Sequence, residues 1–194
     1  MAKKSTRNTR GRIVSGAWKL FYEQGYEDTT VEEIIELSGT SKGSFYHYFD
    51  GKDALLSTLS SLFDEKYEEL TGLLTPEMTA MEQLLFLNRE LFHMIEDSIS
   101  LDLLARLYST QLTTNGEKHL LDHNRIYYKL LRKIIAKGQA EGQLSSRSNV
   151  NEMVKLYALC ERALLYDWCL CAGEYALTEY SAKVLPGFLS SFLP

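Results

Sequence analysis

The hydrophobic positions of this chain recur mostly every three or four residues, which is the spacing of an amphipathic helix. Near the start, Ile13, Ala17, Leu20 and Phe21 fall on one face of a helix that we expect over about residues 10–24. The alternation that is typical of strands does not repeat along the chain. The pattern therefore predicts an all-α protein of about nine helices.

Two short helical patterns follow, between residues 30 and 49. The first carries Val31, Ile34 and Ile35 on one face and starts at a threonine pair that can form a capping box. Gly39 supplies the positive φ that a tight turn between two helices requires. Two helices joined by a short turn that contains glycine are typical of the helix-turn-helix, a DNA-binding motif.

The second of these helices, KGSFYHYF, is unusual for a packing element. Its aromatic residues Phe45, Tyr48 and Phe49 share an inner face. The residues expected on its outer face are Lys42, Gly43, Tyr46 and His47. In a helix-turn-helix, the second helix enters the major groove and its N-terminal residues meet bases and phosphates. The sequence therefore predicts a DNA-reading helix here.

The net charge of −5 is spread unevenly. Residues 1–12 carry five basic side chains and no acid, whereas residues 54–194 carry 13 Lys and Arg against 18 Asp and Glu. A basic arm on an acidic body is typical of a protein that touches phosphate with one end only. The alternative is a solvated tail that aids solubility.

The stretch TTVEEIIELSGTSKGSFYHYFDGKDALL, with AWKLFYEQGYEDTT before it, closely resembles the DNA-binding domain of tetracycline-repressor (TetR) family regulators. The resemblance covers roughly residues 8–56 and includes the Thr-Thr cap, the Gly-x-Ser-Lys-Gly turn and the Tyr-x-Tyr-Phe-x-x-Lys run. Ser38 and Thr40 depart from the residues most common in the family, which leaves the base preference open. The DNA contacts that the resemblance implies are Thr30, Thr40, Ser41, Lys42, Gly43, Ser44, Tyr46, His47 and Lys52.

The resemblance also implies two domains. Residues 1–53 would be the arm and the DNA-binding domain, and residues 54–194 a helical domain for effector binding and dimerisation. The implied protein is a homodimeric cytoplasmic transcription regulator, most often a repressor, that a small molecule releases from a pseudo-palindromic operator. The alternative is a DNA-binding adaptor of the same fold that a protein partner controls.

Beyond the DNA-binding region, the periodicity predicts one long helix after Asp50 and five further helices. Their expected ranges are about 77–97, 99–113, 117–140, 149–172 and 175–191. Aromatic and soft residues on the inner faces suit an apolar effector, although each is also explained as core. The candidate effector contacts are Phe86, Met94, Tyr108, Tyr127 and Trp168.

The last two helices mix small residues with large apolar ones, as helices that pack closely do. The candidate dimer contacts are Tyr157, Cys160, Leu164, Tyr180, Val184 and Phe188. A two-fold dimer presents two recognition helices to two half-sites, whereas one such helix reads too few bases.

We expect no enzyme, cofactor, metal site or membrane span. Gly39 to Gly43 matches the G-x-S-x-G pattern of serine hydrolases, but that pattern requires a strand before the serine. His119 and His123 are spaced to share a helix face, which raises the hypothesis of a metal site. Exposed histidines are the favoured interpretation. The basic stripe Arg125, Lys129, Lys133 and Lys137 is expected to be a solvated face.

Overall fold

The computed structural model describes residues 3–113 and 118–194, with the backbone alone for residues 3–8. These residues form ten α-helices and two short 3₁₀ helices, without a strand. The helices are α1 (Lys3–Gln24), α2 (Val31–Ser38), α3 (Lys42–Tyr48), α4 (Lys52–Leu56), α5 (Leu59–Thr71), α6 (Ala80–Ser98), α7 (Leu101–Thr113), η1 (His119–Leu121), α8 (Ile126–Ala140), α9 (Val150–Leu170), α10 (Leu177–Leu189) and η2 (Ser190–Phe192). The all-α prediction is confirmed.

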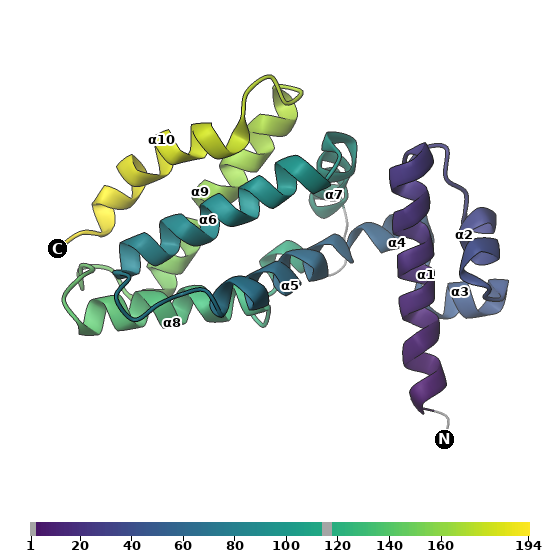
Figure 1. Cartoon of the computed structure of the whole chain (residues 1–194), viewed down its shortest axis with the longest axis horizontal. Helices are drawn as coiled ribbons and strands as arrows, with labels where there is room; N and C mark the ends of the chain where they lie inside the picture. The colour runs from purple at the N-terminus through teal and green to yellow at the C-terminus, as the bar shows by residue number, and fades with distance from the viewer. Residues whose placement is uncertain (1–2, 114–117) are drawn as a thin grey trace.

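Helices α1, α2 and α3 form a small head at one end of the molecule (Figure 1). Its core is made by Ile13 and Ala17 of α1, Ile34 of α2, Phe45 of α3 and the adjoining Phe49, all of which are buried. The helix-turn-helix between residues 30 and 49 is therefore present as predicted, and the inner face of α3 is apolar.

Local hydrogen bonds set the ends of α2 and α3. Thr30 and Glu33 form a complete capping box at the start of α2. Gly39 ends α2 with φ of 59°, a left-handed conformation that glycine adopts without strain. The Ser41 hydroxyl then accepts a hydrogen bond from the amide of Ser44 and caps α3.

The long helix predicted after Asp50 is two helices, α4 and α5, which corrects that prediction. The hydroxyls of Ser57 and Thr58 donate to carbonyls three residues back, at 2.7 and 2.6 Å, and so compete with the helical ladder. Thr58 also accepts a hydrogen bond from Trp18 Nε1 at 2.8 Å. This hydrogen bond connects the break between α4 and α5 to α1. Counting α4 and α5 as one helix gives the predicted nine.

Helices α5 to α10 form the body, a bundle on the other side of α4 (Figure 1). Helix α10 packs along α6 and α9, while α8 packs against α5, α6 and α9. Gly138 of α8 permits one close approach, since a Cβ there would lie 2.6 Å from the Cβ of Ala80 at the start of α6. Among the described helices, none combines the length and apolar character that a membrane crossing requires.

The helix predicted over about residues 117–140 begins later, which is a second correction; residue 117 itself lies outside the described residues. Asp122 accepts a hydrogen bond from the amide of Asn124 and forms a turn that separates η1 from α8. Arg125 at the start of α8 is mostly buried and pairs with Asp64 of α5 at 3.0 Å. The sequence pattern placed Arg125 in a solvated stripe, and its burial against Asp64 shows that this prediction was wrong.

Candidate DNA-binding face and effector cavity

Helix α3 presents a polar outer face. Lys42, Gly43, Tyr46 and His47 are exposed, and the Tyr46 side chain is 45% exposed although it is aromatic. A Cβ built on Gly43 would meet nothing within 4 Å, so another molecule can approach the backbone closely there. The four residues predicted to face outward are thus brought together on one surface.

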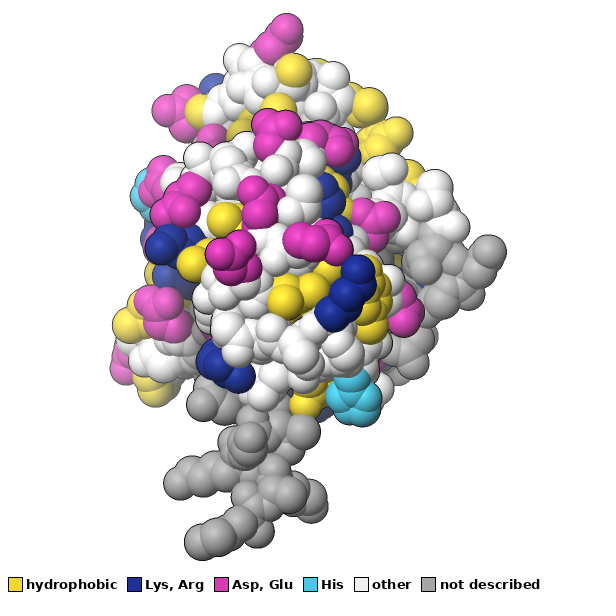
Figure 2. Space-filling view, turned by 90° about the vertical axis from the view of Figure 1, so that its right-hand side faces the viewer, with side chains coloured by type: hydrophobic (Ala, Val, Ile, Leu, Met, Phe, Trp, Pro, Cys, Tyr) yellow, Lys and Arg dark blue, Asp and Glu magenta, His cyan; other side chains and the backbone are white. Residues whose placement is uncertain are grey.

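Charge distinguishes α3 from its neighbour α2. Figure 2 faces the end of the molecule that carries the head, and acidic side chains gather across its middle with basic and histidine side chains lower down. Helix α2 contributes Glu32, Glu33 and Glu36, whereas α3 contributes Lys42 and His47. Phosphate groups would therefore be attracted to the side of the head formed by α3 rather than to α2.

The hydroxyl residues predicted to contact DNA already have partners in the head, and two of them, Thr30 and Ser41, cap helices. Thr30 bonds Glu33 within the capping box, and the amide and hydroxyl of Thr30 hold the pKa of Glu33 below its usual value. The Ser41 and Ser44 hydroxyls lie 2.9 Å apart. The Thr40 hydroxyl lies 2.8 Å from that of Ser38. These side chains fix the geometry of the turn.

Lys52 is placed differently from the other predicted DNA contacts. Its ammonium donates to the carbonyls of Tyr26, Glu27 and Thr29 at 2.6, 3.2 and 2.8 Å. These three acceptors match the three N–H groups of an ammonium. Lys52 therefore stabilises the loop between α1 and α2.

A joint between head and body forms around Tyr26. The Tyr26 ring lies 4.3 Å from the Lys52 ammonium and 4.9 Å from the Arg106 guanidinium. Arg106 of α7 also pairs with Glu27 at 2.6 Å and with Asp102 at 2.9 Å, and these acids raise its pKa. Helix α7 is therefore attached directly to the head.

Two neighbouring cavities lie where α7, η1, α8 and α9 meet. The inner cavity, of about 50 Å³, is lined by Tyr67, Tyr127 and Glu161 among others, and the outer groove has about 390 Å³. Three residues line both: Tyr108, Leu120 and Arg162. The predicted effector contacts Tyr108 and Tyr127 thus meet at one site.

Glu161 is a buried carboxyl group that lines the inner cavity. It accepts hydrogen bonds from Tyr127 Oη at 2.6 Å and from Asn88 Nδ2 at 2.9 Å. Burial raises its pKa, while these hydrogen bonds and the nearby Arg162 oppose the rise. No ion pair to Glu161 occurs in residues 9–113 and 118–194. Asn88 also bonds Ser181, so the network reaches α10.

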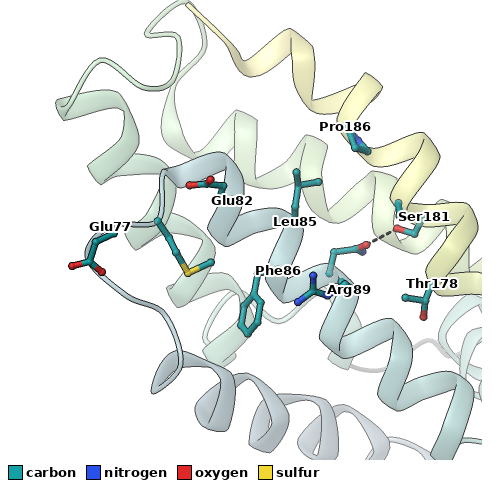
Figure 3. Close-up of a pocket in the computed structure, with 11 residues that line it drawn as sticks. Glu77, Glu82, Leu85, Phe86, Arg89, Thr178, Ser181 and Pro186 are labelled. Atoms are coloured by element: carbon teal, nitrogen blue, oxygen red, sulfur yellow. Dashed lines mark hydrogen bonds between the residues drawn. The ribbon is translucent and has the colours of Figure 1, made fainter.

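A separate groove of about 620 Å³ lies between α6 and α10 (Figure 3). Phe86, a predicted effector contact, lines this groove beside Arg89, with Pro186 on the facing helix. Met94 and Trp168 line none of the three cavities. The predicted effector contacts therefore do not line one common cavity.

The comparisons with known proteins agree with the geometry of the head. A family profile described as "Bacterial regulatory proteins, tetR family" matches residues 13–59. The transcriptional regulator QacR of Staphylococcus aureus is 36% identical over 62 residues, 32% of this chain and 33% of that protein. The repressor AcnR of Corynebacterium efficiens is 40% identical over 53 residues, 27% of this chain and 28% of that protein. The chain thus spans about a third or less of these curated relatives.

Solved structures extend the similarity to the whole chain. FadR of Thermus thermophilus, a TetR-family repressor in complex with lauroyl-CoA, is 25% identical, covers 95% of both chains and has a TM-score of 0.76. Residues 13–59 thus match the DNA-binding domain of TetR-family regulators, and the whole chain shares the fold of TetR-family structures. A TetR-family regulator of Pectobacterium atrosepticum shares this TetR fold with a TM-score of 0.77, over 100% of this chain and 98% of that one, at 17% identity.

The predicted dimer contacts fall into two groups, one on α9 and one on α10. Tyr157, Cys160 and Leu164 of α9 are buried within the subunit, and the Tyr157 hydroxyl donates to the Leu84 carbonyl at 2.8 Å. They cannot lie on a subunit surface, which corrects the predicted face of α9. The opposite face is apolar and exposed, with Leu159, Ala163, Tyr166 and Leu170. Tyr180, Val184 and Phe188 of α10 are exposed or half-buried.

The histidine pair does not have the expected spacing on one helix. His119 begins η1, whereas His123 lies in the turn after it and stacks near Tyr128, with centroids 4.6 Å apart. Within residues 9–113 and 118–194, no group of three or more His, Cys, Asp or Glu side chains is arranged to hold a metal ion.

Sequence reasoning missed Glu161, Arg162 and Arg106. Glu161 occupies a position on the apolar face of α9, between Tyr157 and Leu164, and this break in the pattern was the available indication. Arg106 gave no indication, since its acid partner Glu27 lies far away in the sequence.

We predict different effects from substitutions at Tyr46 and at Lys52. Tyr46→Ala removes an exposed side chain, so DNA affinity should fall by about tenfold while the melting temperature stays unchanged. Lys52→Met leaves three carbonyls without their donor, so stability should fall by about 1–3 kcal/mol. Anisotropy and thermal unfolding measure the two quantities. A stable Lys52→Met variant with weakened DNA binding would show that Lys52 is a DNA contact instead.

Glu161 should also make stability depend on pH. The raised pKa means that the folded protein holds a proton that the unfolded chain releases above about pH 4.3. Stability is therefore lost as the pH rises through the folded pKa. Between about pH 5 and about pH 8, the melting temperature should fall more for the natural chain than for Glu161→Gln. Parallel curves for the two proteins would contradict the assignment.

Proposed function

We propose that the protein is a homodimeric, sequence-specific DNA-binding transcription regulator, and that it acts as a repressor which a small molecule releases from a pseudo-palindromic operator. The observation that carries the proposal is the exposed polar face of α3, held by capped ends on a buried aromatic face. Such a helix fits the major groove, where Lys42 meets phosphate and Tyr46 and His47 reach sugar, phosphate or base edges.

The proposed dimer uses α9 and α10. The exposed apolar residues of α9 recur every three or four positions, and Tyr180, Val184 and Phe188 recur every four positions on α10. Two such helices from each subunit would form a four-helix contact that covers Leu170, which is 66% exposed and lies outside the outer groove. Two heads would then face two half-sites.

The proposed effector site is the pair of cavities beside α7. The groove of about 390 Å³ has the size of a small-molecule site, and tyrosines surround the inner cavity. The similarity to FadR of Thermus thermophilus, whose structure holds lauroyl-CoA, supports a small molecule in the body. The repressor activity named for FadR and AcnR supports repression.

Helix α7 offers the route from the cavity to DNA. Tyr108 lines both cavities, and Arg106, two residues earlier on the same helix, holds Glu27 and Tyr26 of the head. A ligand that displaces Tyr108 would shift α7 and with it the head. Because DNA fixes the spacing of two half-sites, a small shift of each head lowers specific affinity.

A protein-controlled adaptor is the second candidate. The inner cavity of about 50 Å³ is nearly filled by side chains, and Leu112 and Leu121 expose apolar surface at 70% and 48%. A partner protein could cover that surface. The presence of Arg162 in both cavities favours a small ligand instead, since it places a cation at the junction.

The proposal is tested by selecting bound sequences from a random DNA pool and measuring their affinity by anisotropy at two salt concentrations. The protein should enrich a two-fold related sequence and bind it about a thousandfold more tightly than random DNA. Val184→Asp should produce monomers in sedimentation and lose most of this preference, whereas the neighbouring exposed Lys183→Asp should keep both. Equal, salt-sensitive binding to all DNA would contradict the proposal.

A further inference from the structure

The outer groove has a one-sided charge. Its walls are largely apolar and come from α7, η1 and α9, with Leu112, Leu121, Leu159 and Tyr166 among them. Among the described residues that line it, the charged ones are Lys118 and Arg162, and none is Asp or Glu. In a chain with a net charge of −5, a groove whose described charged residues are both cations is distinctive.

Arg162 is the cation best placed to bind a ligand. It lines both cavities. Its Nη1 donates a hydrogen bond to the Tyr128 hydroxyl at 3.2 Å. Arg125, in contrast, is neutralised by Asp64 through two hydrogen bonds at 3.0 and 3.1 Å. Arg162 has no ion pair within residues 9–113 and 118–194, so its charge is not compensated by direct contact.

Glu161 forms no ion pair with Arg162 within residues 9–113 and 118–194, although the guanidinium acts on its pKa through space. Its oxygens accept from Tyr127 and Asn88, on the inner side of the cavity. The two neighbouring residues of α9 therefore point their charges to different partners. An anion in the outer groove would meet Arg162, which lines it, whereas Glu161 lines only the inner cavity.

We propose that the outer groove binds an amphipathic anion, with its acidic group on Arg162 and its apolar tail along the leucine and tyrosine wall. The inference rests on the proposed function, because it names the class of effector for that site. A guanidinium binds carboxylate or phosphate through paired hydrogen bonds, and partial burial strengthens them. The groove volume of about 390 Å³ matches a small ligand.

Three probes with the same alkyl tail test the proposal: decanoate, decanol and decyltrimethylammonium. Calorimetry with the full chain, below the concentration at which each probe forms micelles, should show decanoate binding about tenfold or more tightly than the other two. Arg162→Gln should remove this preference, and Arg162→Lys should restore part of it. Arg89→Gln, a surface arginine in the α6–α10 groove, should bind decanoate as the natural chain does.

Several outcomes overturn the proposal. They are tighter binding of the cation, no binding of any probe, decanoate binding that survives Arg162→Gln in a folded protein, and conversion of dimers to monomers by decanoate, which would make the groove a subunit contact. Measuring operator release in parallel separates the two proposals. Decanoate that binds through Arg162 without releasing DNA would support the ligand class and contradict effector release. DNA release by decyltrimethylammonium alone would support effector release and contradict the proposed ligand class.

Discussion

The arrangement of the molecule depends on the packing of Tyr26 between two cations. Lys52 approaches its ring from the start of α4, and Arg106 approaches it from α7. Its hydroxyl bonds Asp53, and the ring itself is buried. Because Lys52 and Arg106 also bind the loop that contains Glu27, one aromatic ring joins the head to α4 and to α7.

Helix α7 both contacts the head and lines the cavities, through residues that are close together on the helix. Arg106 contacts the head and Tyr108 lines the cavities, so a change at the cavity has a short path to the head. The uncompensated charge of Arg162 and the buried carboxyl of Glu161 are found at the same place. Ionisable groups that are buried without an ion pair are costly inside proteins, which makes this region sensitive to a bound ligand.

Local structure was predictable from the sequence, and long-range pairing was not. The face of α3 followed from the spacing of Phe45 and its neighbours, since caps and periodicity act within a few residues. The break before α5 depends on Thr58 meeting Trp18, and the burial of Arg125 depends on Asp64. Those partners lie 40 and 61 residues away, where periodicity carries no information. The face of α9 was misjudged because both of its faces are apolar.

The most direct test is the ratio of operator affinity to random-DNA affinity for Arg106→Gln, measured without any ligand. If the Tyr26 joint sets the orientation of the head, this variant should bind random DNA as the natural chain does, because non-specific contacts need no fixed spacing. Its operator affinity should fall by about tenfold or more. An unchanged ratio in a folded dimer would show that the joint does not position the head, and the account of α7 would be wrong.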